Sequence, residues 1–390
     1  MSKGFLKACF GPLTLLNKFI KKDEKLVFFY SNMGFRDNVR AVYDYMMEHG
    51  YNEEYRIVCA IDEWEEYKME KKYLPEQYKN VKFVSLKGGI LKFLRAKYAF
   101  YSFGKYPIKP SKEQVVVNVW HGMPLKRIGN MEKGKEKVKY NYFTYILATS
   151  EFFADIMMKS FSCSKEQVII NGQPRNDVMF KEDKELDERI RMGASKFIFW
   201  LPTYRKKLRA EENEYAIDDL GKQKSPIDLL KSVRGHDFDA LLRENNVQLI
   251  VKHHPLHMED DIGYFTNIKV FSHKDFENAG CDLYSYLRNA DALITDYSSV
   301  YFDYLLLDRP IGFVLDDMND YNEERGFVFD NPLDMMPGAH IKTEKDLTEF
   351  VLSVIEGRDE YAAKRRQFND MVNQYQDGNS TKQLLDRIMK

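Results

Sequence analysis

The 390-residue sequence is poor in cysteine, in net charge and in long apolar runs, and each shortage excludes a class of protein. The 59 basic and 60 acidic residues give a net charge of -1, which supplies no global field for binding nucleic acid. No apolar run is long enough to span a bilayer, so we expect no integral membrane protein. The four cysteines lie too far apart for a zinc site or a disulfide scaffold, which indicates a reducing, cytoplasmic compartment: Cys9, Cys59, Cys163 and Cys281.

Residues 1–24 are predicted to form an amphipathic segment that binds the membrane surface. In MSKGFLKACFGPLTLLNKFIKK the apolar residues recur at helical spacing, a pattern typical of a basic helix on anionic lipid. Pro12 is expected to kink or split this helix. The alternative is a helix packed on the protein's own core. The lysines around the apolar face are Lys3, Lys7, Lys18, Lys21 and Lys22.

The rest of the chain alternates short apolar strands with helical segments, which predicts parallel sheets covered by helices. A length of 390 residues suggests two such domains. We place the boundary in the polar stretch KEDKELDERIRMG, which gives Rossmann-like domains at 25–183 and 184–390 that face a cleft. One helix is expected in RDNVRAVYDYMMEHG, with Gly50 as terminator. The expected strands lie in LVFFYS, YRIVCAI, VKFVSL, YAFYSF, VVVNVW, YILATS, FIFWL, VQLIV, IKVFS, DALIT and IGFVL.

In VVVNVWHGMPLKRIG, a strand that reads as buried on both faces runs directly into His121. Ligands of open parallel sheets bind just beyond the carboxyl ends of the strands, where His121 stands. Gly122 follows, with no side chain to obstruct a substrate. His121 is therefore a candidate catalytic residue, and a capping histidine in a loop is the alternative.

Polar residues also follow three strands of the second half. Ser298 and Ser299 precede the apolar helix VYFDYLLLD, where free backbone amides and the helix dipole favour a phosphate. As an alternative, Ser298 is a simple N-cap. Cations at the neighbouring strand ends favour the phosphate interpretation. The polar residues that follow these strands are Thr203, Tyr204, Arg205, Lys252, His253, His254, Asp296, Ser298 and Ser299.

The motifs HGMPLKRIG, NGQPRND, PTYR, KHHP, LITDYSSVYFDYLLLDRPIGF and YNEERGFVFD, in this order, resemble those of the CDP-glycerol glycerophosphotransferases that make teichoic acids and related capsule polymers. The resemblance runs from about Lys25 to Pro337, and the chain departs from the family pattern at Met123 and His253. It implies a glycosyltransferase-B-like fold and a CDP-activated polyol phosphate donor. It also implies a lipid-linked saccharide or polyol-phosphate acceptor, met peripherally at the cytoplasmic face of the cell membrane.

In the implied reaction an acceptor hydroxyl attacks the β-phosphorus of the donor and CMP leaves, so a proton must be removed and phosphate charge neutralised. The predicted catalytic residues are His121, as general base, and His254. Arg175 is expected to hold the pyrophosphate, with a surface arginine as the alternative. Asp303 is expected to bond a donor hydroxyl, with an ion pair on the helix as the alternative. The predicted donor-binding residues are Gly122, Arg175, Thr203, Tyr204, Arg205, Lys252, His253, Asp296, Ser298, Ser299 and Asp303.

No cofactor and no metal is predicted, because the cationic side chains already face the pyrophosphate. The competing hypothesis is a divalent ion held by the D-x-D pattern of Asp237 and Asp239, although Asp237 is expected to cap a helix instead.

The sequence is compatible with three classes of function. The first is transfer of a polyol phosphate; glycerol phosphate is the group that we expect, with CDP-ribitol as the alternative donor. The second is an ordinary nucleotide-sugar glycosyltransferase of the same fold, and the third is a membrane-associated scaffold. The motif set favours the first.

Overall fold

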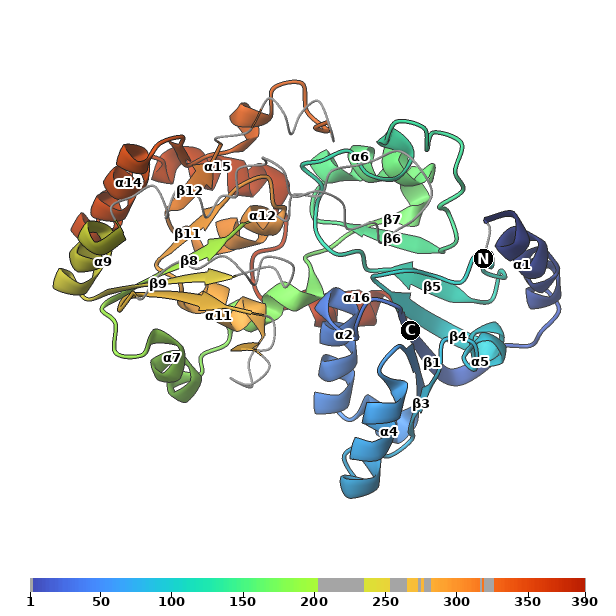
Figure 1. Cartoon of the computed structure of the whole chain (residues 1–390). Helices are drawn as coiled ribbons and strands as arrows, with labels where there is room; N and C mark the ends of the chain where they lie inside the picture. Colours follow the sequence, from blue (N-terminus) through green and yellow to red (C-terminus); the bar gives the residue numbers. More distant parts are fainter. Residues whose placement is uncertain are drawn as a thin grey trace. The chain divides into compact units, whose positions relative to one another are not determined.

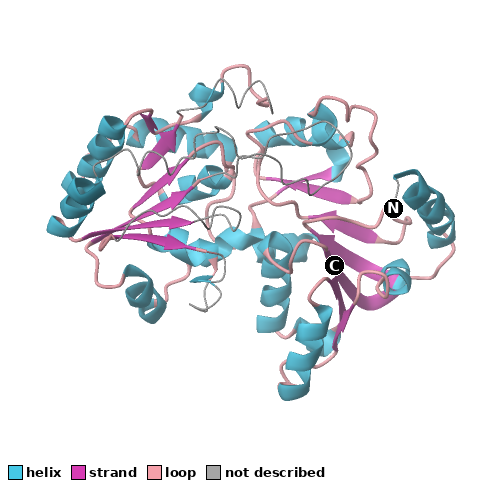
Figure 2. Ribbon diagram, viewed as in Figure 1, coloured by secondary structure: helices cyan, strands magenta, loops and turns pink. Residues whose placement is uncertain are grey.

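The computed structural model describes residues 3–202, 235–252, 265–272, 275–276, 282–315, 318 and 326–389, with backbone alone for 3–9 and 235–236. The chain folds into two compact units, each an α/β structure built on a parallel sheet (Figures 1 and 2). The first unit comprises residues 1–123, 128–177 and 372–390, and the second comprises 124–127 and 178–371. The predicted α/β class with two parallel-sheet domains is confirmed.

The first unit contains a seven-stranded sheet in the order β3-β2-β1-β4-β5-β6-β7, with every pair of neighbours parallel. Its central strands are buried on both faces, as the continuous apolar runs predicted. The order reverses between β1 and β4, which is the switch point where doubly wound sheets bind ligands. The strands are β1 (Asp23–Ser31), β2 (Arg56–Ile61), β3 (Val81–Val84), β4 (Ala96–Tyr101), β5 (Val115–Asn118), β6 (Tyr145–Ala148) and β7 (Val168–Ile170).

Several helices of this unit bury apolar residues. In the predicted helix, now α2, the residues Val39, Val42, Tyr43 and Met46 are all buried, and Gly50 adopts the left-handed conformation just after its end. Helices of this unit are α1 (Lys3–Asn17), α2 (Asp37–Glu48), α3 (Tyr51–Glu54), α4 (Trp64–Tyr73), α5 (Ile90–Arg95), α6 (Glu151–Phe161) and α16 (Ser380–Ile388). Short 3₁₀ turns occur at Gly129–Met131, Lys165–Gln167 and Pro174–Phe180.

The second unit contains a six-stranded sheet in the order β10-β9-β8-β11-β12-β13, again with parallel neighbours. Its switch point lies between β8 and β11. The strands are β8 (Lys196–Leu201), β9 (Val247–Lys252), β10 (Ile268–Phe271), β11 (Ala292–Thr295), β12 (Ile311–Val314) and β13 (Ala339–Ile341). The helices are α7 (Lys184–Arg191), α9 (Gly235–Glu244), α11 (Leu283–Asn289), α12 (Val300–Tyr304), α14 (Glu344–Glu356) and α15 (Ala362–Val372), with 3₁₀ turns at Leu305–Leu307 and Pro332–Met335.

The division of the chain differs from the predicted limits of 25–183 and 184–390. Helix α16 buries Leu384, Leu385 and Ile388 in the core of the first unit, so the C-terminal segment belongs there (Figure 1). Asp177 fixes the start of this helix by accepting hydrogen bonds from the backbone nitrogens of residues 380 and 381 at 2.9 and 2.8 Å. The boundary was expected in the charged stretch after residue 180, but that stretch forms α7 and packs with the second unit.

The N-terminal segment forms a single helix, α1, that continues through Pro12, so the predicted split of this helix is wrong. Lys22 does not belong to a solvated basic face: it is 4% exposed and donates to the backbone oxygens of Asn17 and Leu94. Leu16 and Phe19, in contrast, are 47% and 79% exposed. Among the described residues, no helix has the length and apolar character needed to cross a membrane.

Candidate active site

The chain turns sharply where β5 ends, and this turn carries His121. Trp120 has a φ of 49°, which is unusual for a residue other than glycine, and Gly122 has a φ of 121°, which side chains rarely permit. His121 is half-buried and lies just beyond the carboxyl end of the strand, as the sequence predicted. Non-glycine residues in strained conformations gather at functional sites, because the surrounding structure must hold them.

Aromatic rings enclose the His121 imidazole. The Phe103 ring, which follows the end of β4, stacks on it with a centroid distance of 4.8 Å and an angle of 14°. The Trp120 ring lies 4.0 Å away at 32°. Strands β4 and β5 are paired neighbours, so these rings come from adjacent strand ends at one edge of the sheet. The stacking restricts the orientation of the imidazole, as a catalytic group requires.

Side-chain amides hold both backbone groups of Trp120 in its strained conformation. Asn118 accepts a hydrogen bond from the Trp120 nitrogen at 3.1 Å, and Asn38 donates to the Trp120 oxygen at 3.1 Å. Asn38 is fully buried and also donates to the Val119 oxygen and to Gln173 Oε1, both at 3.0 Å. Sequence reasoning missed Asn38, whose only local signal is a polar residue beside the apolar face of a helix.

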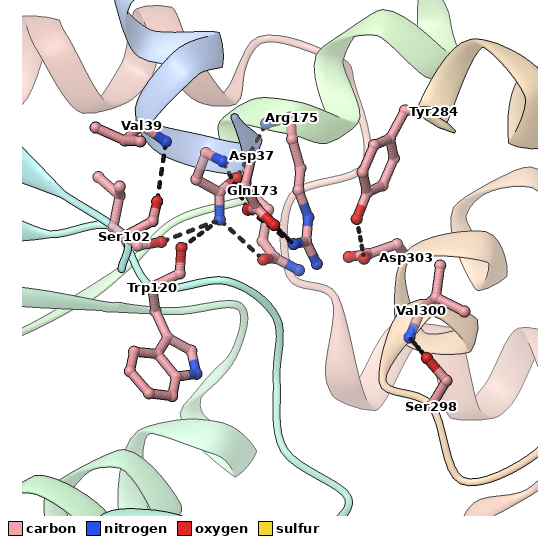
Figure 3. A network of polar contacts seen from close by, with 12 residues as sticks. Asp37, Val39, Ser102, Trp120, Gln173, Arg175, Tyr284, Ser298, Val300 and Asp303 are labelled. Carbon is pink, nitrogen blue, oxygen red and sulfur yellow. Dashed lines mark hydrogen bonds and ion pairs between the residues drawn. The ribbon is translucent and has the colours of Figure 1, made fainter. Parts of the chain in front are cut away.

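Arg175 is 6% exposed, so the alternative of a surface arginine is wrong. Its Nη1 donates to both carboxylate oxygens of Asp37, at 2.8 and 2.7 Å, and its backbone nitrogen donates to Asn38 Oδ1 at 3.0 Å (Figure 3). Asp37 starts α2 with a φ of 67°. A buried arginine needs such a partner because an isolated buried charge is costly. Asp37 was absent from the predicted site, and the role of Arg175 with the donor stays a prediction.

In the second unit, β11 leads into Asp296 and Tyr297, which are fully buried, and then into the half-buried Ser298 and Ser299. Ser298 Oγ accepts a hydrogen bond from the Val300 nitrogen at 3.4 Å (Figure 3). Ser299 occupies the N-cap position of α12 without a side-chain cap. The predicted placement of both serines at the start of this helix is thus confirmed, whereas their contact with a phosphate stays a prediction.

Asp303 is also fully buried, and one of its oxygens accepts a hydrogen bond from the Tyr284 hydroxyl at 3.1 Å (Figure 3). Lys252 is half-buried at the end of β9, the strand position that the sequence predicted. The other predicted residues of this unit lie outside the described part of the chain: Thr203, Tyr204, Arg205, His253 and His254.

The two carboxylates of the D-x-D pattern have different surroundings, because Asp237 is exposed and Asp239 is buried. Asp237 is exposed in the first turn of α9, two residues after the helix begins, so the prediction that it caps this helix is wrong. Asp239 is 6% exposed and accepts hydrogen bonds from the nitrogens of Thr266 and Asn267, at 3.1 and 2.7 Å. Within the described residues, no three His, Cys, Asp or Glu side chains lie close enough to hold a metal ion.

Residues 124–127, shortly after His121, belong to the second unit, which the sequence did not indicate. Lys126 pairs with Phe327 as an antiparallel bridge, and the Val328 nitrogen donates to the Leu125 oxygen at 2.9 Å. Arg127 donates from Nε to the Phe327 oxygen at 3.0 Å. The motif HGMPLKRIG therefore contributes residues to both units.

Comparison with known proteins adds to this geometry. Residues 13–390 match the family model described as "CDP-Glycerol:Poly(glycerophosphate) glycerophosphotransferase". The teichoic acid glycerol-phosphate primase of Bacillus subtilis is 30% identical over 289 residues, which cover 71% of this chain and 68% of that protein. The teichoic acid poly(glycerol phosphate) polymerase of Bacillus spizizenii is 28% identical over 403 residues, covering 95% and 93% of the two chains.

A ribitol-phosphate enzyme is similar to the chain over a smaller share. The teichoic acid poly(ribitol-phosphate) polymerase of Bacillus spizizenii is 28% identical over 265 residues, which cover 63% of this chain and 39% of that protein. Among solved structures, the wall teichoic acid polymerase TagF superposes with a TM-score of 0.72 at 22% identity, covering 98% of this chain and 93% of the other. The likeness to TagF establishes the similarity of fold.

Proposed function

The chain belongs to the CDP-glycerol:poly(glycerophosphate) glycerophosphotransferase family, and from this premise we propose that it transfers glycerol phosphate from CDP-glycerol to a hydroxyl of a lipid-linked acceptor. The family and the relatives identify the class of enzyme, a CDP-polyol phosphotransferase of teichoic acid synthesis, and the proposal adds the polyol. Glycerol is favoured over ribitol because two glycerol-phosphate relatives match 95% and 96% of the chain, whereas three ribitol-phosphate relatives match 63%, 74% and 73%. A second candidate, CDP-ribitol as donor, rests on the ribitol-phosphate relative.

The proposed reaction exchanges one phosphorus–oxygen bond for another. The acceptor oxygen forms a bond to the β-phosphorus, and the bond from that phosphorus to the bridging oxygen breaks. CMP leaves with the electron pair of that bond. The acceptor proton goes to a ring nitrogen of His121, since an imidazole titrates near neutral pH.

The observation that carries this proposal is the construction of the His121 turn. The imidazole is stacked on Phe103, and the strained backbone beside it is bound by two buried amides. A solvated loop histidine needs no such support, whereas a general base must keep one orientation toward its substrate.

On the donor side we propose that phosphate charge is met at the switch point of the second sheet. The half-buried Ser298 and Ser299 supply hydroxyl donors there, and Lys252 supplies a cation at the end of β9. His254 as second catalytic residue and the donor contacts of Thr203, Tyr204, Arg205 and His253 remain predictions. We propose no cofactor and no metal for the reaction, because these cations and donors serve the phosphates.

We further propose that α1 and the start of the chain dock peripherally on an anionic membrane at its cytoplasmic face, where a lipid-linked acceptor is reached. Three exposed apolar residues support this docking: Leu15, Leu16 and Phe19, at 58%, 47% and 79% exposure. Leu91 on α5 is another, at 69%. Lys18 and Lys21 accompany them, as expected for a segment that binds anionic lipid.

The activity is tested by incubating the full chain with CDP-glycerol, CDP-ribitol or UDP-sugars, in each case with an alkyl-linked glycerol phosphate acceptor. We expect CMP release from CDP-glycerol that requires the acceptor and persists in EDTA. Faster release from CDP-ribitol would move the assignment to the second candidate. Release of UDP alone would refute polyol phosphate transfer, and activity lost in EDTA and restored by manganese would refute the metal-free mechanism.

A further inference from the structure

A half-buried lysine, Lys105, lies at the switch point of the first sheet, close in sequence to the ring that stacks on His121. The stretch 103–105 follows β4, whose neighbours are β1 and β5. Phe103 contacts the imidazole, and Lys105 lies two residues further on, so their Cα atoms are separated by no more than about 7 Å. Phe103 and Lys105 thus follow the end of one strand, and the neighbouring strand β5 leads to His121.

Two tyrosine rings hold the Lys105 ammonium. Its Nζ lies 5.0 Å from the centroid of the Tyr140 ring and 5.9 Å from that of Tyr142. Both distances fall within the range of cation–π attraction. Each phenol also carries an O–H that can donate, so the three side chains supply both a positive charge and hydrogen-bond donors for an anion.

In the part of the chain that the structure describes, no carboxylate forms an ion pair with Lys105. Burial lowers the pKa of Lys105 below its ordinary value, which reflects the cost of keeping this charge partly desolvated. Arg175, a buried cation of the same unit, has the Asp37 carboxylate as its partner. Rings alone compensate a charge less fully than an anion does. Among the described residues the Lys105 site therefore lacks a negative partner, and a ligand can supply one.

The segment of the chain just before Tyr140 and Tyr142 is rich in lysine. Lys133, Lys137 and Lys139 are exposed in the stretch before Tyr140, and none of them forms an ion pair among the described residues. The two carboxylates of this stretch are already engaged: Glu132 pairs with Lys135, and Glu136 accepts a hydrogen bond from the Gly134 nitrogen. Exposed lysines around a half-buried one suit a ligand that carries more than one negative charge.

We propose that Lys105, Tyr140 and Tyr142 form a binding site for a phosphate group of the acceptor, which places the acceptor hydroxyl at His121. The inference rests on the proposed function and deepens it, since it assigns the acceptor to an anionic class, a phosphate-bearing polyol or lipid. Lys105 is a binding residue in this arrangement. The catalytic step still belongs to His121.

The test compares Lys105→Met, which keeps an apolar stem against the rings, with Lys105→Arg and the control Lys112→Met. Lys112 is an exposed lysine of the same loop. We measure CMP release with an alkyl-linked glycerol phosphate dimer and with its uncharged alkyl glycerol counterpart. Lys105→Met should raise the KM of the dimer about tenfold or more, the loss of one charge-assisted contact. The KM values of the neutral acceptor and of CDP-glycerol should stay unchanged, and Lys105→Arg should retain most of the affinity.

An equal rise for charged and neutral acceptors, or no rise at all, would overturn the phosphate site. Calorimetric titration of the dimer without any donor separates this inference from the proposed function. If the wild-type chain releases no CMP from any CDP-polyol, the proposed function fails, yet the titration still decides the site. Binding that Lys105→Met weakens about tenfold or more and Lys112→Met preserves supports the site, whereas equal binding in both variants refutes it.

Discussion

Replacing Asn38 by alanine should lower the stability of the first unit more than replacing a buried asparagine that makes a single side-chain hydrogen bond. The Asn38 side chain makes four hydrogen bonds, with the backbone of Val119, Trp120 and Arg175 and with the side chain of Gln173. Each buried polar group that loses its partner costs about 1–3 kcal/mol. The four bonds share one side chain and do not add independently, so we expect a total of about 3–5 kcal/mol.

Hydrogen exchange followed by mass spectrometry measures this loss as the opening free energy of peptides that cover residues 115–121. The matched control is Asn52→Ala, because Asn52 is 7% exposed, lies in the same unit and donates one hydrogen bond, to the Lys79 oxygen at 3.0 Å. We expect about 1–2 kcal/mol for the control. If Asn38→Ala costs no more than Asn52→Ala, the turn is held by other means and the reasoning fails.

Three further outcomes are expected. His121→Asn should lower turnover by about a hundredfold to ten-thousandfold with unchanged affinity for CDP-glycerol, and near-normal CMP release would remove it as general base. Burial, with Lys364 and Lys342 nearby, lowers the pKa of His340 in the folded chain. As the pH drops, this histidine therefore binds a proton in the unfolded chain before it does so in the folded one. The free energy of unfolding should fall below about pH 6.5. His340→Gln should flatten this fall, measured as melting temperature from pH 7 to 5, and parallel curves would contradict the assignment. Leu16→Gln with Phe19→Gln should reduce sedimentation with phosphatidylglycerol vesicles at physiological salt. Met69→Gln with Tyr73→Gln, at exposed positions of α4, should leave it unchanged, and equal binding by both variants would refute the docking surface.

Strands were predictable wherever the sequence has a run of apolar residues of sufficient length, because such a run is typical of a strand buried on both faces. β5 and β11 were found on that basis, together with the polar residues at their ends. β7 and β13 were missed because each has three residues, too few for any periodicity. The serines before α12 were placed correctly because helix starts carry local signals.

The partners of the site were not predictable in the same way. Arg175 and Asp37 are separated by 138 residues, and nothing near either one indicates the other. Lys105 lies in the stretch SFGKYPIKP, and nothing in this sequence distinguishes it from a solvated lysine of a loop. Only the fold brings it over Tyr140 and Tyr142. Local patterns identify the ends of strands, whereas the contacts that select one function require the tertiary structure.

The path of the chain through the two units has a consequence for the timing of folding during synthesis. Residues 372–390 complete the first unit, but the ribosome makes them after the whole stretch 178–371. At the usual rates of translation that stretch takes roughly 10 to 40 s. Throughout this interval the apolar surface that Leu384, Leu385 and Ile388 later cover stays open to solvent or to a chaperone. The unit that begins to form first is therefore the one that is finished last.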